Sequence, residues 1–550
     1  MLQIALKKIR DFYDGGNRWW LPLICGFLYA LPNPPFNAML HPVFAPMPVF
    51  AFTALIPLLF FATRKPRRRA LVHSYLYCVA LALGQYYWVG FVTAEGFWML
   101  ILIGVALMSI VLGAYMFIAA LAYRFFAPRL PRLCVVVYPA VWTLMDYGRS
   151  VTDLAFPWSY TGYSAVGILP LAQFASFTGV WGLSYLIVLG NVVIWELLRA
   201  IRAKENIQQK WLAAGVWAAL IIGIFVWGAF RMNINPRAGG ETAKVALVQS
   251  YMDQFNWTGN SLDTAMRISD SMAGTAAAAK PDVIIFPESA LHCFLDRRPD
   301  IRREVLSWAD DAKPPIIIGA LHWERPERDT GDKYDVYNTV FLVDSGKLTP
   351  YHKTMLVPFS EAMPFEARFP ILSRVNIGLS SFKRGNEETL FRVNDKLETA
   401  PYICYEIIFP SFVRRRLAES TNLIIGVTND GWFGRSSGPY QHAAMAQMRS
   451  VENGITLARS ANSGISMFVD PYGRVLSKSK LYTREIIIRD IPTFRIITFY
   501  TRFGDWFVAF CAIAAAAGIL ACFINRKRPG EITNPLLIDI EEQKLAAVNR

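Results

Sequence analysis

The sequence predicts a helical membrane bundle joined to an α/β layered domain outside the membrane, and three observations support this. Of the 550 residues, 54% are hydrophobic, a larger share than soluble domains usually carry. Eight apolar runs approach or exceed the roughly 20 residues that cross the hydrocarbon core of a bilayer. One long segment, 232–502, instead has normal polar content and short β-branched runs. We therefore expect about eight transmembrane helices and one exterior domain.

The boundaries of the apolar runs are approximate. They are 18–37, 44–63, 71–92, 97–123, 133–148, 166–198, 211–231 and 503–525. The first contains Leu-Pro-Asn-Pro-Pro at 31–35, so it is expected to bend or to span only in part. The sixth is long enough to tilt or to break, at Gly179 or Gly182.

Lysine and arginine gather in every second loop between these runs. The basic positions are Lys7, Lys8, Arg10, 64–69, Arg124, Arg129, Arg132, Arg199, Arg202, Lys204 and 526–528. The positive-inside rule then places both termini in the cytoplasm. The net charge of +14 thus reflects membrane topology, and no nucleic-acid partner is predicted. No small-residue cleavage site follows the first run, so it is not interpreted as a signal peptide.

This topology divides the chain into four parts. They are a bundle of seven helices at 1–231, a periplasmic domain at 232–502, a last transmembrane helix at 503–525 and a cytoplasmic tail at 526–550. Strands are predicted in the exterior part at 245–249, 283–286, 316–321, 339–343, 402–404, 423–427, 465–469 and 486–488. Helical patterns such as 262–279 and 442–453 lie between them, which predicts sheets covered by helices.

Only two of the seven cysteines, Cys293 and Cys404, belong to the exterior part. The others lie in apolar runs, where a free cysteine usually acts as a small hydrophobic residue. Cys404 follows a predicted strand, at a sheet end that could present a reactive thiol. Two alternatives stay open for it: a buried structural cysteine, or a disulfide with Cys293 in an oxidising compartment.

Glu288 ends another predicted strand, and Lys353 lies in a loop, in Tyr-His-Lys at 351–353. Taken alone, Glu288 could cap a helix, and Lys353 could be a solvated loop residue. A cysteine that attacks a carbonyl needs a base for its proton, donors for the oxyanion and a site that raises the thiolate fraction. Together, Glu288, Lys353 and Cys404 supply that set without a histidine.

This ordered set resembles the Glu-Lys-Cys triad of the nitrilase, or carbon–nitrogen hydrolase, superfamily. The likeness continues through Phe-Pro-Glu-Ser, His-Lys-Thr-Met-Leu-Val-Pro-Phe, Ile-Cys-Tyr-Glu, Asn-Asp-Gly-Trp-Phe-Gly and Arg-Ser-Ala-Asn-Ser-Gly, which begin at 286, 352, 403, 429 and 459. Nearly the whole chain resembles the apolipoprotein N-acyltransferase family. That resemblance implies a nitrilase-like αββα sandwich inserted before the last transmembrane helix.

The family resemblance also implies a ping-pong acyl transfer. A phospholipid, phosphatidylethanolamine or a relative, would acylate Cys404 as a thioester. The α-amine of the N-terminal diacylglyceryl cysteine of an apolipoprotein would then take the acyl chain. Glu288 would be the general base, and Lys353 with the backbone N–H of Tyr405 would stabilise the oxyanion. No cofactor is expected, and the resemblance suggests a monomer in the bacterial inner membrane.

Supporting roles are assigned on the same basis. Glu361 would orient the lysine or the incoming amine, although it could be a surface carboxylate. Glu406 would brace the nucleophile loop or cap the start of a helix. Trp257 and Trp432 would line the acyl or headgroup path, with interfacial anchoring as the alternative. Arg149, in an exterior loop, would meet a lipid phosphate or snorkel from a helix end.

No metal site is predicted, because the six histidines form no close ligand pairs. Two other functions stay open. A membrane-tethered amidase would release the acyl group to water, but a soluble substrate would not require so many spans. A non-catalytic lipid-binding protein would not require an intact triad. The sequence therefore favours an acyltransferase.

Overall fold

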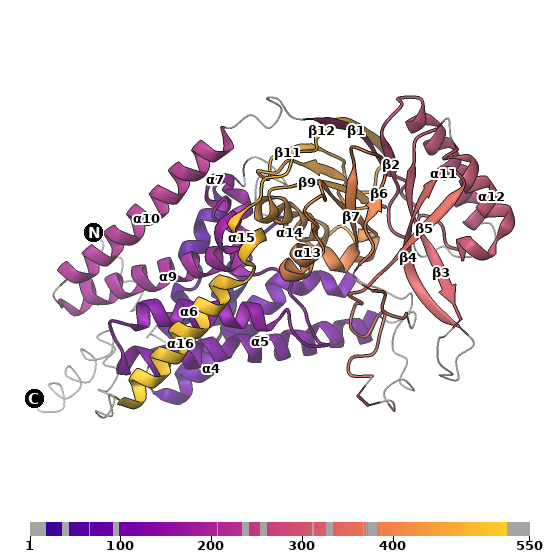
Figure 1. Ribbon diagram of the computed structural model, residues 1–550. Helices are drawn as coiled ribbons and strands as arrows, with labels where there is room; N and C mark the ends of the chain where they lie inside the picture. The colour runs from indigo at the N-terminus through magenta and orange to yellow at the C-terminus, as the bar shows by residue number, and fades with distance from the viewer. Residues whose placement is uncertain are drawn as a thin grey trace, which may run out of the picture.

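The computed structural model has a helical bundle on one side and a two-sheet domain on the other (Figure 1). It describes residues 18–35, 43, 45–64, 66–91, 98–205, 207–233, 241–252, 261–310, 313–325, 334–366, 368–369, 371, 382–386 and 388–524. Lys7, Lys8, Arg10, Trp257 and the tail 526–550 lie outside the described residues.

Six helices of at least 15 residues form most of the bundle. They are α4 (Arg67–Tyr86), α5 (Trp98–Arg129), α6 (Cys134–Gly148), α9 (Val180–Ala203), α10 (Gln208–Met232) and α16 (Trp506–Ile524). Shorter pieces connect or cover them. These are α2 (Trp20–Leu28), η2 (Met47–Phe52), α3 (Ile56–Ala62), η3 (Tyr87–Phe91), η4 (Thr161–Gly167), α7 (Leu169–Ala172), α8 (Ala175–Thr178) and α15 (Phe499–Phe503).

Within the described ranges, four helices rather than eight are long and apolar enough to cross a membrane: α5, α9, α10 and α16. Prolines account for part of the difference, because proline interrupts a helix. The first run forms only the nine residues of α2, and the second is split into η2 and α3, which both begin at prolines. α6 has 15 residues. The sixth run breaks at Gly179, whose φ of +67° precedes α9.

The second part of the molecule contains two six-stranded sheets. The first has the order β12-β1-β2-β3-β4-β5, with β1 (Thr242–Gln249), β2 (Val283–Ile285), β3 (Ile316–Glu324), β4 (Asp335–Asp344), β5 (Lys347–His352) and β12 (Glu485–Pro492). The second has the order β11-β10-β9-β8-β7-β6, with β6 (Phe391–Arg392), β7 (Glu398–Ile403), β8 (Leu423–Thr428), β9 (Thr456–Ala461), β10 (Met467–Val469) and β11 (Val475–Lys478). All eight predicted strands are present, and β5, β6, β9 and β11 are additional.

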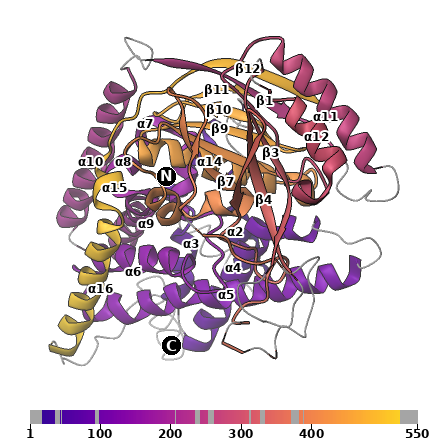
Figure 2. The same cartoon turned by 45° about the vertical axis from the view of Figure 1, so that its right-hand side comes forward.

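Each sheet has a parallel centre, β1-β2-β3 in one and β7-β8-β9 in the other. Alternate residues of a strand face opposite sides, so one face of each sheet packs on the other sheet, as Val245 and Ile425 do. The opposite face of the first sheet is covered by α11 (Ser261–Ala277) and α12 (Pro299–Ser307) (Figure 2). α13 (Pro410–Arg415) and α14 (Gly438–Asn453) cover the second. The αββα sandwich is therefore confirmed.

α14 lies between the second sheet and the bundle. It contacts β9 on one side and α8 and η4 on the other, and every residue of it except Tyr440 is buried. Because polar groups inside a protein need partners, its charged residues bond across the interface. Arg449 donates to the Tyr163 hydroxyl at 2.8 Å, and Glu452 accepts from the Val180 N–H at 3.0 Å. The sandwich and the bundle therefore share one continuous core.

Candidate active site

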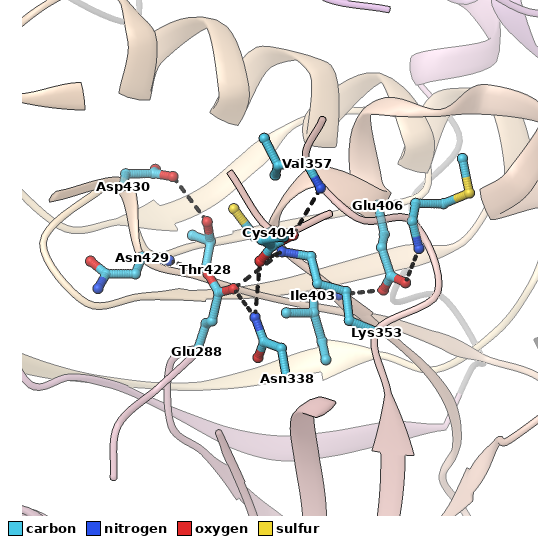
Figure 3. A network of polar contacts seen from close by, with 12 residues as sticks. Glu288, Asn338, Lys353, Val357, Ile403, Cys404, Glu406, Thr428, Asn429 and Asp430 are labelled. Carbon is cyan, nitrogen blue, oxygen red and sulfur yellow. Dashed lines mark hydrogen bonds and ion pairs between the residues drawn. The ribbon is translucent and has the colours of Figure 1, made fainter. Parts of the chain in front are cut away.

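Glu288, Lys353 and Cys404 lie close together (Figure 3). They come from the segments that follow the C-terminal ends of β2, β5 and β7. The Lys353 Nζ lies 3.4 Å from Glu288 Oε1, and both charges act on the Cys404 thiol. The structure therefore brings together the three residues that the sequence predicted as a set.

Lys353 is almost completely buried, with 1% of its side chain exposed. Its Nζ donates to Glu361 Oε1 at 2.7 Å and to Glu288 at 3.4 Å. Burial alone would lower the pKa of this ammonium, but the two carboxylates outweigh that effect and raise it. Lys353 therefore stays protonated, as an oxyanion-stabilising cation must. Glu361 is buried beside it and is not a surface carboxylate.

Asn338, on β4, completes this arrangement, and sequence analysis did not identify it. Its Nδ2 donates to Glu288 Oε1 at 2.9 Å and to Glu361 Oε1 at 3.3 Å. The other oxygen of Glu288 accepts the backbone N–H of Asn429 at 2.9 Å. Both carboxylates are thereby held around one ammonium. Asn338 directly precedes the predicted strand 339–343, and nothing in the local sequence distinguished it from the polar residues beside it.

Cys404 begins the 3₁₀ segment η7 (Cys404–Ile408), with a φ of +49° that is uncommon for a non-glycine residue. Burial raises the pKa of its thiol, and the negative charge of Glu288 raises it further. Lys353 and a hydrogen bond with Thr428 act in the opposite direction. Because the net shift is upward, the resting thiol is protonated at neutral pH, and its reaction requires a base.

A disulfide between Cys404 and Cys293 does not form. Both cysteines are free. Cys293 packs under α11 and α12 on the outer face of the first sheet, whereas Cys404 packs against the core between the two sheets. A layer of sheet separates them, so this alternative is wrong.

Glu406 both braces the nucleophile loop and caps its start. Its fully buried carboxylate accepts the N–H of Ile403 at 2.7 Å, the cap interaction of η7. It also accepts the N–H groups of Thr354 at 2.6 Å and Met355 at 3.2 Å, and the Tyr351 hydroxyl at 2.9 Å. One carboxylate therefore ties the segment that follows Lys353 to the turn that carries Cys404.

Replacing Glu406 with glutamine is expected to destabilise the sandwich by about 2–4 kcal/mol. Both carboxylate oxygens now accept backbone N–H groups. In glutamine the NH2 group would replace one of these oxygens and face an N–H donor, so that buried donors are left unpaired. Thermal unfolding of the purified protein measures the effect. The exposed Glu388, changed to glutamine, is the matched control. Equal unfolding midpoints for the two variants would contradict the bracing role.

His442 and Asp430 form a second buried support for Cys404. His442 Nδ1 lies 2.8 Å from Asp430 Oδ1, and its Nε2 lies 3.1 Å from the carbonyl oxygen of Cys404. Arg459 donates to the other Asp430 oxygen at 2.6 Å. Burial would raise the pKa of Asp430, but Arg459 and His442 lower it to about 2. The chain of contacts holds the backbone of Cys404. Asp430 and Arg459 belong to two of the sequence motifs, whereas His442 belongs to none of them.

Arg149 lies inside the protein and not in an exterior loop. It caps the end of α6 and is buried. Its guanidinium bonds to Asp146 at 2.7 Å, to the Tyr86 hydroxyl at 2.8 Å and to the carbonyl of Trp158 at 3.0 Å. A buried cation needs such partners, and they occupy its donors inside the bundle.

The nucleophile turn also contacts the bundle. The Tyr405 hydroxyl donates to the carbonyl oxygen of Ala155, in the loop after α6. Trp158 of the same loop donates to Gln441 of α14 at 2.8 Å and packs against His442. Trp432 is half-buried in η8 (Asp430–Phe433), beside this aromatic cluster. The site therefore lies at the junction of the two parts.

Comparison with known proteins finds two matching family models and several named relatives. The model of the carbon-nitrogen hydrolase family matches residues 244–499, and that of the apolipoprotein N-acyltransferase N-terminal domain matches 25–193. The apolipoprotein N-acyltransferase of Rickettsia typhi is 31% identical over 83% of this chain and 92% of its own length. That of Geobacter metallireducens is 29% identical over 92% and 95%. A mutant amidase of Nesterenkonia AN1 from the nitrilase superfamily aligns over 46% of this chain and 92% of its own, with 19% identity and a TM-score of 0.34.

The two-sheet sandwich and its Glu-Lys-Cys cluster define a domain of the carbon–nitrogen hydrolase class. That domain is joined here to a bundle that matches a second, membrane-type family model. The chain belongs to the apolipoprotein N-acyltransferase family.

Proposed function

We propose that this protein transfers a fatty acyl chain from a phospholipid, through a thioester on Cys404, to the N-terminal diacylglyceryl cysteine of apolipoproteins. Phosphatidylethanolamine is the proposed donor and the free α-amine the acceptor. The observation that carries the proposal is the buried cluster of Glu288, Lys353 and Cys404 at the junction with an apolar bundle. The names of its relatives support the same activity.

In the first half-reaction, Glu288 takes the proton of the Cys404 thiol while the sulfur attacks the ester carbonyl of the phospholipid. Lys353 and the backbone N–H of Tyr405 stabilise the tetrahedral oxyanion. The C–O bond then breaks, and Glu288 returns the proton to the departing lysophospholipid oxygen. The product is an acyl thioester, in which Glu288 is again a carboxylate.

In the second half-reaction, the α-amine attacks the thioester carbonyl and Glu288 accepts its proton. The C–S bond breaks as the amide forms, and the thiolate takes the proton back. Glu361 and Asn338 keep Lys353 and Glu288 in register during both halves. Trp432 lines the approach of the lipid chains in this proposal.

The membrane setting completes the proposal. Residues 1–231 and 503–525 embed the chain in the bacterial inner membrane, and 232–502 lie on the periplasmic side. The alternation of basic loops supports this orientation. Apolar side chains that face outward from α5, α10 and α16 support lipid contact; they include Leu102, Leu107, Leu212, Ile222, Ile513 and Leu520. Two lipid-anchored substrates would reach a site at the membrane surface by lateral diffusion within the membrane.

A phospholipid with a single acyl type is expected to leave one acyl group on the protein. The full-length protein is incubated in vesicles of this phospholipid, and the reaction is then quenched. The intact mass of the protein is measured before and after treatment with hydroxylamine, which cleaves thioesters. An adduct that hydroxylamine removes, followed by acylation of an added diacylglyceryl peptide, is the expected result.

Two variants sharpen this experiment. Cys404→Ala should carry no adduct, whereas Cys293→Ala, which changes a buried cysteine elsewhere in the same sandwich, should carry it normally. Free fatty acid without acylated peptide would favour the tethered amidase. An undiminished adduct on Cys404→Ala would refute the thioester.

A further inference from the structure

Three side chains gather on the outer face of the first sheet, away from the active site. They are His322 and Glu324 on β3 and His352 at the end of β5. His322 Nδ1 lies 3.4 Å from His352 Nε2, and that nitrogen lies 3.4 Å from Glu324 Oε1. The third side of the triangle, from His322 Nδ1 to Glu324 Oε1, measures 3.7 Å.

The register of the sheet produces this triangle. β4 lies between β3 and β5, so that His322 pairs with Tyr337 and His352 pairs with Thr339. Tyr337 and Thr339 are two positions apart and share one face of β4. His322 on β3 and His352 on β5 therefore lie on the two sides of β4, on the same face of the sheet. Glu324, two residues after His322, lies on that face too. The histidines are 30 residues apart in sequence, which is why their spacing predicted no metal site.

The size of the triangle matches the coordination shell of a small divalent cation. Zinc bound tetrahedrally at about 2.0–2.1 Å places its ligand atoms about 3.3–3.4 Å apart. Two imidazole nitrogens and one carboxylate oxygen are a ligand set that zinc accepts, with a fourth position left for water. We propose that His322, Glu324 and His352 form a zinc site on the outer face of this sheet.

The surroundings of the histidines support a ligand role. Thr339 Oγ1 lies 2.9 Å from His352 Nδ1, and Asp296 Oδ2 lies 3.4 Å from His322 Nε2. Each ring therefore has its second nitrogen beside an oxygen, which directs the other nitrogen into the triangle, as outer partners of metal-binding histidines do. Tyr337 stacks on His352 with ring centres 4.3 Å apart.

The site is open on one side. The histidine side chains are 13% and 16% exposed, whereas Glu324 is 50% exposed. An ion can therefore enter from solvent past the carboxylate. Bound zinc would tie β3 to β5 across β4. Lys353 directly follows His352 and Asn338 directly precedes Thr339, so both active-site residues point to the opposite face of the sheet. The proposal rests on this geometry alone and does not depend on the acyl-transfer function.

Zinc binding to the full-length protein, purified without a histidine tag, tests the proposal. The Cys404→Ala background removes the active-site thiol as a competing ligand. After EDTA treatment and equilibration with buffered micromolar zinc, elemental analysis should find one zinc per chain. In that background, His322→Ala should bind zinc at least about 100-fold more weakly, and Thr339→Val about 10-fold more weakly. The unfolding midpoint should rise by about 5 °C at saturating zinc, and not in His322→Ala.

Controls separate binding from folding. Glu304→Gln, on the exposed side of α12, should keep full affinity, whereas Glu324→Gln should lose most of it. Metal-free His322→Ala should unfold at the temperature of its metal-free parent. If His322→Ala and the parent bind zinc equally, or if the parent binds none at micromolar concentration, the proposed site is wrong.

Discussion

Glu288→Gln is expected to slow acyl transfer by about 10³-fold, within the range known for loss of a general base. Glutamine has the same shape, but its one amide oxygen can keep only one of the two bonds that now hold the carboxylate, from Asn338 to Oε1 and from the Asn429 N–H to Oε2. It cannot take the proton of a thiol whose pKa lies above its ordinary value. Initial rates of peptide acylation in vesicles measure the loss.

The reactivity of Cys404 toward iodoacetamide provides the control for this variant. Because the negative charge of Glu288 raises the pKa of the thiol, the substitution should lower that pKa. At alkaline pH the variant should therefore be alkylated as fast as the wild type or faster, although acyl transfer is lost. Parallel loss of alkylation and transfer would indicate a damaged fold instead of a missing base.

Lys353→Met is expected to abolish transfer and to destabilise the sandwich. Loss of one oxyanion donor reduces rates by about 10²–10³-fold. The substitution would also leave the buried carboxylates of Glu288 and Glu361 without their cation. Breaking a buried ion pair in this way costs about 3–5 kcal/mol. Peptide acylation and the thermal unfolding midpoint should both fall.

The thiol should respond to Lys353→Met in the opposite direction from Glu288→Gln. Lys353 lowers the pKa of Cys404, so its removal should raise that pKa and slow alkylation at alkaline pH. Lys347→Met, an exposed lysine at the start of β5, is the matched control and should change neither rate. If Cys404 in Lys353→Met is alkylated at the wild-type rate, the Lys353 ammonium does not act on the thiol.

The strands that could be predicted were those with apolar, β-branched sequences. β5 and β9 were missed because Lys-Leu-Thr-Pro-Tyr-His and Thr-Leu-Ala-Arg-Ser-Ala do not follow that pattern. A proline is tolerated in β5 because this strand lies at the edge of its sheet. β9 is buried, and its Arg459 is paired with Asp430. Tertiary partners, invisible in a local pattern, stabilise polar residues there.

The same limit applies to the site. Glu288 and Cys404 could be predicted because each follows an apolar, strand-like segment. Lys353 could be predicted because it completes a known chemical set with them, although β5, the strand before it, was missed. Asn338 and His442 act through contacts with other elements, which no spacing along the chain reveals. The burial of Arg149 could not be predicted, because its partners, Asp146 and Tyr86, are brought to it only by helix packing.

The burial of α14 on both faces has a consequence for how this molecule works. Because α14 is buried against both the second sheet and the bundle, separating it from either one would expose apolar and charged groups to water. The sandwich is therefore held rigidly on the bundle, and Cys404 keeps a constant distance from the bundle helices. In the proposed reaction, both lipid-anchored substrates would therefore have to move to reach the thiol.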